Sequence, residues 1–295
     1  MSVTSARAGL VECVLGWYEL AARDLPWRAP ATTPWAVLVS EVMLQQTPVA
    51  RVLPAYLAWL ERWPTPSALA AEQPGEAVRA WGRLGYPRRA LRLHAAASAI
   101  VERHGGGVPA SYAELLALPG VGDYTASAVA VFAFQGRHAV LDTNVRRVLA
   151  RAVSGNAGPT PSVTVRERGL AESLLPDDGE LAARFAVGLM ELGALICQAR
   201  TPMCSACPLA DRCGWRLAGF PAPAGPARRV QRYEGTDRQA RGALLAVLRG
   251  SRRPIPAARL DEAWPDPVQR ARALDSLVAD GLVDKLPGGR FRLPA

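Results

Sequence analysis

The sequence predicts a mainly α-helical protein that carries a small α+β module at its C-terminal end. Apolar residues recur at spacings of three and four through the first 219 residues, and no stretch there alternates as a strand would. A segment rich in proline and glycine, residues 219–235, interrupts this pattern and reads as a linker. Two helical patterns and a hairpin signal follow it, so we expect a separate module over residues 236–295.

Length and composition fit a folded protein. With 295 residues the chain exceeds the size at which a single hydrophobic core stops growing, so two domains are expected. Hydrophobic residues make up 49% of the chain and charged residues 21%, which argues against disorder. No apolar run approaches the ~20 residues of a membrane helix, and the N-terminus lacks a signal-peptide core. We therefore expect a cytoplasmic protein with no membrane partner.

The charge of the chain points to nucleic acid. The formal net charge is +9, and Lys285 is the single lysine among the 35 basic residues. Residues 220–295 hold 14 basic and 8 acidic residues, against 21 and 18 in residues 1–219. Arg228, Arg229 and Arg232 extend this excess into the linker. A basic chain of this kind attracts the phosphate backbone, so we expect the module to support DNA affinity more than catalysis.

Several helix starts are visible in the sequence. Thr33 and Pro34 fit an N-cap followed by proline at the first helical position, and Ser111 with Glu114 fits a capping box. After the linker, residues 237–249 are helical, and Asp266 opens a second helix that ends near Gly281. Residues 282–286 and 290–293 then alternate around a Pro-Gly-Gly turn, which signals a hairpin. This order favours a winged-helix module, with a generic α+β cap as the alternative.

A glycine hairpin lies between two helical stretches, at Leu118-Pro119-Gly120-Val121-Gly122. Glycine permits a tight turn and a close approach of the backbone to a ligand. The free N–H groups at the start of the following helix can bind a phosphate. The motif favours a helix-hairpin-helix DNA-binding element over a plain interhelical turn.

Four of the five cysteines lie within 17 residues, with the spacing C-x6-C-x2-C-x5-C. Such clustering in a cytosolic chain indicates metal rather than disulfides. Zinc and a [4Fe–4S] cluster both accept four thiolates, although a zinc ribbon would normally show two C-x2-C pairs. Cys13 lies far from the others in an apolar helix and is expected in the core. The candidate ligands are Cys197, Cys204, Cys207 and Cys213.

Two acidic residues, Glu41 and Asp142, have apolar neighbours in the sequence. Glu41 belongs to a helix that is apolar on nearly every side, so it is expected to be partly buried, and a buried carboxyl group tends to stay protonated, which suits a general acid. Asp142 follows an apolar run and precedes a helix, which fits an N-cap as well as a carboxylate that stabilises positive charge. The sequence separation of about a hundred residues leaves open whether the two acids meet.

Taken together, the motifs make the chain resemble the MutY adenine DNA glycosylases of the endonuclease III superfamily. The match covers roughly residues 10–217. It runs through LPWR, SEVMLQQT, Arg83-Leu84-Gly85-Tyr86, LPGVGDYTA, LDTNVRRVLAR, MELGALIC and the cysteine loop.

The resemblance implies a helix-hairpin-helix DNA glycosylase fold over residues 1–218. A six-helix domain is expected at 30–140, with the helix-hairpin-helix at 111–134, and an iron–sulfur cluster domain at 1–29 and 141–218. It also implies one [4Fe–4S] cluster per chain, a monomer located with the nucleoid of a prokaryotic-type cell, and double-stranded DNA carrying an adenine mispair as the partner. Gly120, Val121 and Gly122 would grip the DNA backbone.

The activity implied by the resemblance is the base excision repair of adenine mispaired with 8-oxoguanine or guanine. Glu41 matches the acid that protonates adenine, Asp142 the carboxylate that stabilises the positive sugar, and Asn144 its neighbour. The adenine must leave the base stack to reach these groups. By the same resemblance, the residues that line the base pocket are Trp27, Arg28, Leu44 and Glu191, and those that wedge into the duplex or meet the opposite base are Gln45, Gln46 and Tyr86.

Position 124 separates two kinds of enzyme within this superfamily. Bifunctional members place a lysine there, whereas this chain has Tyr124, and a phenol cannot form a Schiff base with the sugar. A monofunctional glycosylase is therefore expected.

The chain also departs from the family pattern. Pro87 replaces a second aromatic residue, Thr143 replaces a glycine, and residues 220–295 lack the histidine and the strands of the usual 8-oxoguanine-reading domain. Two alternatives stay open: a mismatch glycosylase for another base, such as thymine opposite guanine, and an iron–sulfur DNA-binding regulator.

Overall fold

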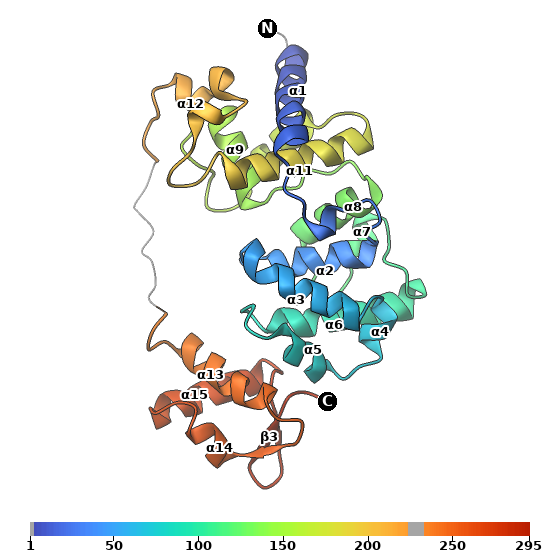
Figure 1. The fold of residues 1–295 in the computed structure, drawn as a ribbon, viewed down its shortest axis with the longest axis vertical. Helices are drawn as coiled ribbons and strands as arrows, with labels where there is room; N and C mark the ends of the chain where they lie inside the picture. Colours follow the sequence, from blue (N-terminus) through green and yellow to red (C-terminus); the bar gives the residue numbers. More distant parts are fainter. Residues whose placement is uncertain (1–2, 224–232) are drawn as a thin grey trace. The chain divides into compact units, whose positions relative to one another are not determined.

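The computed structural model of the protein describes residues 3–223 and 233–295, and most of them are helical (Figure 1). The described chain divides into two units. The first takes the residues up to Val37, Ala110–Leu116 and the chain from Gly122 through the cysteine loop. The second takes Leu38–Pro109, Ala117–Val121 and the described residues after the linker. Arg228, Arg229 and Arg232 lie outside the described residues.

Within its described residues the first unit contains helices and no strand. Its long helix α11 packs against α1, α8 and α9 (Figure 1). The side chains of Val14, Phe185 and Leu192 are buried in this packing. The helices are α1 (Val3–Ala21), η1 (Pro26–Arg28), α7 (Tyr112–Leu116), α8 (Asp123–Phe134), α9 (Thr143–Ala152), α10 (Val165–Leu174), α11 (Gly179–Leu195), η2 (Cys204–Ala206), η3 (Ala210–Arg212) and α12 (Gly214–Leu217).

The second unit is built on five helices and a core of tryptophans. Trp59 meets Trp63 edge-on at 4.6 Å and Trp81 at 5.7 Å between ring centroids, and all three side chains are buried. Edge-on pairs of this kind add to the stabilisation that burial provides. The helices are α2 (Pro34–Leu44), which begins in the first unit, α3 (Val49–Arg62), α4 (Pro66–Ala70), α5 (Pro74–Trp81) and α6 (Arg88–His104).

The second unit also contains the C-terminal module. Its helices are α13 (Asp237–Arg249), α14 (Ala257–Asp261) and α15 (Pro267–Ala279), and its strands are β1 (Ile255–Pro256), β2 (Asp284–Leu286) and β3 (Arg290–Arg292). The strands form an antiparallel sheet in the order β1-β3-β2, in which Phe291 pairs with both Ile255 and Lys285. The hairpin prediction is confirmed, and the winged-helix order is completed by β1 and α14, which the sequence analysis missed because each is very short.

The predicted helix starts are confirmed. Thr33 Oγ1 accepts from the Ala36 amide at 3.2 Å, and Ser111 Oγ accepts from the Glu114 amide at 3.3 Å. Asp266 caps α15 by accepting from the two amides that follow Pro267. No helix in the described part of the chain is long and apolar enough to cross a membrane.

The contacts divide the chain along different lines from the expected domains 30–140 and 141–218. Helix α8 belongs to the first unit, because Ala128, Val131, Val140 and Ala186 form one buried cluster that joins it to α11. The C-terminal module, in turn, shares its unit with α3 to α6.

Candidate active site and cysteine centre

Glu41 lies on a helix that is buried on every side. Trp35 through Met43 are all buried, and the Glu41 residue itself is only 6% exposed. The helix can be buried because every residue from Trp35 to Met43 is apolar, except Ser40 and Glu41 itself. Glu41 is thus more deeply buried than the sequence predicted, and the helix ends at Leu44, which is half-buried.

The turn after this helix is held by one buried arginine. Arg89 Nη1 donates to the Gln45 carbonyl at 2.5 Å, and its Nη2 donates to Thr47 Oγ1 at 3.0 Å and to the Gly85 carbonyl at 3.2 Å. Gln46, between these contacts, is exposed and has a φ of 55°. Non-glycine residues keep a left-handed backbone only where the surroundings impose it, and Arg89 supplies that constraint.

A second strained loop, residues 82–87, connects α5 to α6 beside the same arginine. Tyr86 has a φ of 47° and is 53% exposed. The Arg89 guanidinium lies 5.4 Å from its ring centroid, and Trp81 Nε1 donates to the Gly85 carbonyl at 2.9 Å. The second unit therefore presents Gln46 and Tyr86 from two loops that share one support.

The two glycines of the hairpin, Gly120 and Gly122, have different surroundings. Gly120 has a φ of 75°, and a Cβ built there would lie 2.5 Å from Arg92 Cβ, so this glycine lets the hairpin pack on α6. Gly122 N-caps α8 without any side-chain cap, and no atom lies within 4 Å of a Cβ built on it. The open glycine and the uncapped helix start leave room for a phosphate. Val121 is buried.

Asp142 caps α9 and is held by three donors. Its Oδ1 accepts from the Asn144 and Val145 amides at 2.9 and 2.6 Å, and its Oδ2 accepts from Asn144 Nδ2 at 2.8 Å. Burial raises the pKa of Asp142, and the hydrogen bonds from Val145 and Asn144 offset part of this rise. The predicted N-cap is confirmed, and it does not exclude the other predicted role of this carboxylate, the stabilisation of positive charge.

Glu191 is an anion fixed by two arginines. Its side chain is fully buried and accepts from Arg23 Nε at 2.6 Å and from Arg28 Nη2 at 2.8 Å. Burial alone would raise the pKa of Glu191, but these hydrogen bonds outweigh it and lower the pKa to about 2. Arg28 Nη1 is also buried and makes no hydrogen bond within the described residues. Trp27, beside it, is 8% exposed.

Tyr124 lies in the first turn of α8. Its ring packs against the buried cluster of Ala128, Val131 and Ala186. The position therefore offers a phenol on an apolar support and no amine.

The four cysteines of the loop line one pocket of the first unit, together with Arg151, Met203 and Trp215. None of them forms a disulfide, and all are half-buried. Burial raises the pKa of Cys207 to about 11, and the neighbouring thiols add to this effect. Such a group loses its proton at neutral pH only if a cation binds it. Cys13 packs against the core, as expected.

Sequence reasoning missed the arginines that connect these groups. Arg147 donates to Asn144 Oδ1 at 2.7 Å and to the carbonyls of Gly193 and Cys197, both at 2.6 Å. It thereby orients the Asn144 amide toward Asp142 and joins α9 to the cysteine loop. Arg23 and Arg89 were missed for the same reason: the sequence does not distinguish a buried arginine from a solvent-exposed one.

The chain is similar to known DNA repair proteins in sequence and in fold. Residues 39–172 match the HhH-GPD superfamily of base excision DNA repair proteins. The adenine DNA glycosylase of Mycolicibacterium smegmatis is 57% identical over 281 residues, which covers 95% of this chain and 94% of that protein. The thymine-DNA glycosylase of Aeropyrum pernix is 36% identical over 214 residues, or 72% of this chain and 94% of that protein. The structure of a thermostable thymine-DNA glycosylase covers 74% of this chain and all of its own, with a TM-score of 0.66 and 28% identity.

Proposed function

The chain belongs to the adenine DNA glycosylases of the HhH-GPD superfamily of base excision DNA repair proteins, and on this premise we propose that it removes adenine mispaired with 8-oxoguanine or guanine. It acts on double-stranded DNA as a monofunctional enzyme. It hydrolyses the N-glycosidic bond of a flipped-out adenine and leaves the sugar–phosphate backbone intact.

The observation that carries this proposal is the contrast between two acids. We assign Glu41 as the proton donor because it is buried in an otherwise apolar helix, and burial in general favours the neutral form of a carboxyl group. Asp142 lies at a helix start, where three donors stabilise its ionised form against the rise in pKa that burial causes. A glycosidic bond breaks most easily when one acid protonates the leaving base and another, ionised, stabilises the positive sugar.

In the proposed reaction Glu41 gives its proton to the adenine ring, and the electrons of the glycosidic bond leave with the base. The sugar then carries positive charge, which the Asp142 carboxylate stabilises while Asn144 holds that carboxylate in place. A water molecule adds to the sugar and loses a proton, which completes the hydrolysis. Arg28 Nη1, which has no hydrogen-bond partner among the described residues, is the donor that we propose the flipped-out adenine would meet.

Tyr124 supports the monofunctional part of the proposal, since it offers no amine for a covalent intermediate. Borohydride reduces a Schiff base to a stable link, so we expect no trapping of the wild-type enzyme on adenine-mispaired DNA. Efficient trapping that persists after substitution of Lys285, the single lysine, would contradict this assignment.

We also propose that Cys197, Cys204, Cys207 and Cys213 hold a [4Fe–4S] cluster. The four side chains line one pocket, which fits a single shared centre. The sequence spacing contains one C-x2-C pair where a zinc ribbon normally has two, which favours an iron–sulfur cluster over zinc. When bound, the cluster would supply a rigid, thiolate-ligated core for the loop, and the arginines that join α9 to the loop would depend on that rigidity.

Thymine excision is the alternative to adenine excision, because the Aeropyrum pernix relative is named a thymine-DNA glycosylase. A panel of duplexes separates the possibilities. The protein is incubated with adenine opposite 8-oxoguanine, adenine opposite guanine and thymine opposite guanine, and each abasic product is then cleaved in hot alkali. We expect strand breaks at adenine alone. Breaks at thymine would support the alternative, and binding without any break would indicate a DNA-binding regulator.

A further inference from the structure

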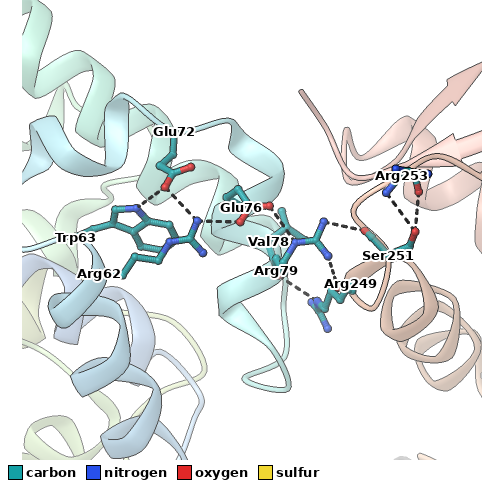
Figure 2. A network of polar contacts seen from close by, with 9 residues as sticks. All are labelled: Arg62, Trp63, Glu72, Glu76, Val78, Arg79, Arg249, Ser251 and Arg253. Carbon is teal, nitrogen blue, oxygen red and sulfur yellow. Dashed lines mark hydrogen bonds and ion pairs between the residues drawn. The ribbon is translucent and has the colours of Figure 1, made fainter.

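The C-terminal module is attached to α5 through main-chain carbonyls (Figure 2). Arg79 on α5 donates to the carbonyl of Arg249 and, at 2.9 Å, to that of Ser251. Arg249 donates in return from Nε to the Val78 carbonyl at 3.0 Å. Burial in this contact lowers the pKa of Arg249 to about 10. Because main-chain groups cannot rotate away, these bonds fix the position of the module as well as its attachment.

The start of α5 provides another contact of the same kind. The Gly75 amide donates to the Pro294 carbonyl at 2.8 Å, next to the end of the chain. A Cβ built on Gly75 would lie 2.4 Å from that oxygen, so only glycine permits the approach.

A chain of ion pairs connects this attachment to the tryptophan core (Figure 2). Glu76 pairs with Arg79 at 2.9 Å and with Arg62 at 2.8 Å. Arg62 pairs with Glu72 at 3.0 Å, and Glu72 accepts from Trp63 Nε1 at 3.4 Å. The Arg79 side chain is therefore held on both sides before the module binds to it.

The module also contacts the start of α6. Asp280, which follows α15, pairs with Arg88 at 3.1 Å and with Arg241 of α13 at 2.5 Å. Arg88 is the first residue of α6 and lies two residues after Tyr86. The module is thus bonded to both helices that flank the strained loop 82–87.

From this arrangement we infer that the module braces loop 82–87 and thereby fixes Tyr86 as the residue that meets the DNA strand opposite the target base. The role in opposite-strand contact rests on the proposed function, whereas the bracing does not. A loop with left-handed backbone at Tyr86 keeps that conformation only if its ends are held. An exposed aromatic ring held in this way can insert between bases, and its position then decides which opposite base is accepted.

The ion pairs of the module argue against a role based on charge alone. Four of its arginines are paired with carboxylates of the same module, so they attract phosphate less than their number implies. These pairs are Arg241 with Asp280, Arg270 with Asp261, Arg272 with Asp237, and Arg292 with Asp284.

Hydrogen exchange on the full-length, DNA-free protein tests the brace. Arg79→Met and Asp280→Ala each remove one attachment, while Arg259→Met and Asp275→Ala make the same charge changes at exposed module positions. We expect the amides of residues 82–88 to exchange about tenfold faster in the first two variants and unchanged in the controls. Unchanged exchange of this loop in both Arg79→Met and Asp280→Ala would overturn the inference, whatever the enzyme does to DNA.

Excision assays provide the functional readout. Single-turnover rates and dissociation constants are compared for adenine opposite 8-oxoguanine and adenine opposite guanine. The brace predicts that the ratio of the two rates changes at least threefold in Arg79→Met and Asp280→Ala, with matched-duplex affinity within twofold of wild type. An equal loss of affinity for all duplexes with an unchanged ratio would show that the module acts through charge. If the wild type excises no adenine, the proposed function is wrong. The hydrogen-exchange result still shows whether the module holds loop 82–87 in place.

Discussion

At the scale of single residues, Asp142 is an observed helix cap to which we also assign a chemical role. Its Oδ1 closes the start of α9, and its Oδ2 faces the Asn144 amide. The amide is oriented in turn by Arg147, which occupies its oxygen. The carboxylate is therefore held in a fixed orientation before any substrate arrives, which is the condition for electrostatic stabilisation of a positive sugar.

Asp142→Asn should separate these two roles. Asparagine is as good an N-cap as aspartate, so the free energy of unfolding should change by less than about 1 kcal/mol. Adenine release should fall by about 10³-fold or more, because the neutral amide cannot stabilise the cation. Chemical denaturation and single-turnover excision measure the two quantities. An active and stable variant would remove Asp142 from the mechanism.

Glu41→Gln should abolish adenine release and leave mismatch binding largely intact. Glutamine keeps the size of the side chain but has no proton of comparable acidity to give. Single-turnover excision and an electrophoretic binding assay on the same duplex provide the comparison. Retention of more than a few per cent of the wild-type rate would contradict the role of Glu41 as the acid.

The ion pair at Glu191 should make stability depend on acid pH. The folded-state pKa of about 2 lies below the ordinary value of 4.5, so the stabilisation is complete above pH 4.5 and is lost as the pH falls toward 2. The shift corresponds to roughly 3 kcal/mol at neutral pH. Glu191→Gln should therefore lower the free energy of unfolding by about that amount at pH 7, and the difference from wild type should shrink between pH 4.5 and 2. A pH-independent difference would show that the pair contributes only through packing.

At the scale of elements, the glycine hairpin combines a packed half and an open half. Gly120 is required by its backbone and by the stem of Arg92, whereas Gly122 faces open space at the start of α8. The two glycines look equivalent in the sequence, and only their surroundings distinguish them.

Alanine at each position should give opposite results. Gly120→Ala forces a Cβ against Arg92 at a left-handed residue and should cost about 2 kcal/mol or more of stability. Gly122→Ala should change stability by less than about 0.5 kcal/mol but weaken binding to matched and mismatched DNA alike, because it narrows the approach to the helix N-terminus. Thermal unfolding and binding titrations test both. Equal destabilisation by the two substitutions would contradict this division.

At the scale of the whole molecule, arginines connect the cysteine loop to helix α9, which Asp142 caps. Arg147 and Arg151, both on α9, donate to main-chain carbonyls of the loop at Cys197 and Gln198. Arg151 also lies 4.6 Å from the Trp215 ring centroid. Any disturbance of the loop should therefore reach Asn144 and Asp142 through α9.

The purified protein should be brown and contain about four irons per chain, as four cysteine ligands imply for a cubane cluster. Iron analysis and the visible absorption spectrum provide the measurement. Cys204→Ser should lower iron content and reduce excision through the loop contacts, with Cys13→Ser as the matched control outside the loop. One zinc per chain and no iron would contradict the assignment.

Sequence patterns alone were enough to predict the helical class, the grouping of the four cysteines, the apolar helix around Glu41 and the order of helices and hairpin after the linker. Each of these depends on local spacing: apolar periodicity, the C-x2-C pair, N-caps and the Pro-Gly-Gly turn. Such patterns can be recognised in the sequence because the residues that form them are close together in the chain.

The tertiary structure alone decided which arginines are structural and where the module sits within its unit. Arg79, Arg89 and Arg147 form bonds to carbonyls that are 40 or more residues away, and nothing local separates them from the solvated arginines beside them. Their role comes from burial, which makes each unsatisfied carbonyl and each unpaired guanidinium costly, and burial is a property of the folded chain rather than of any segment.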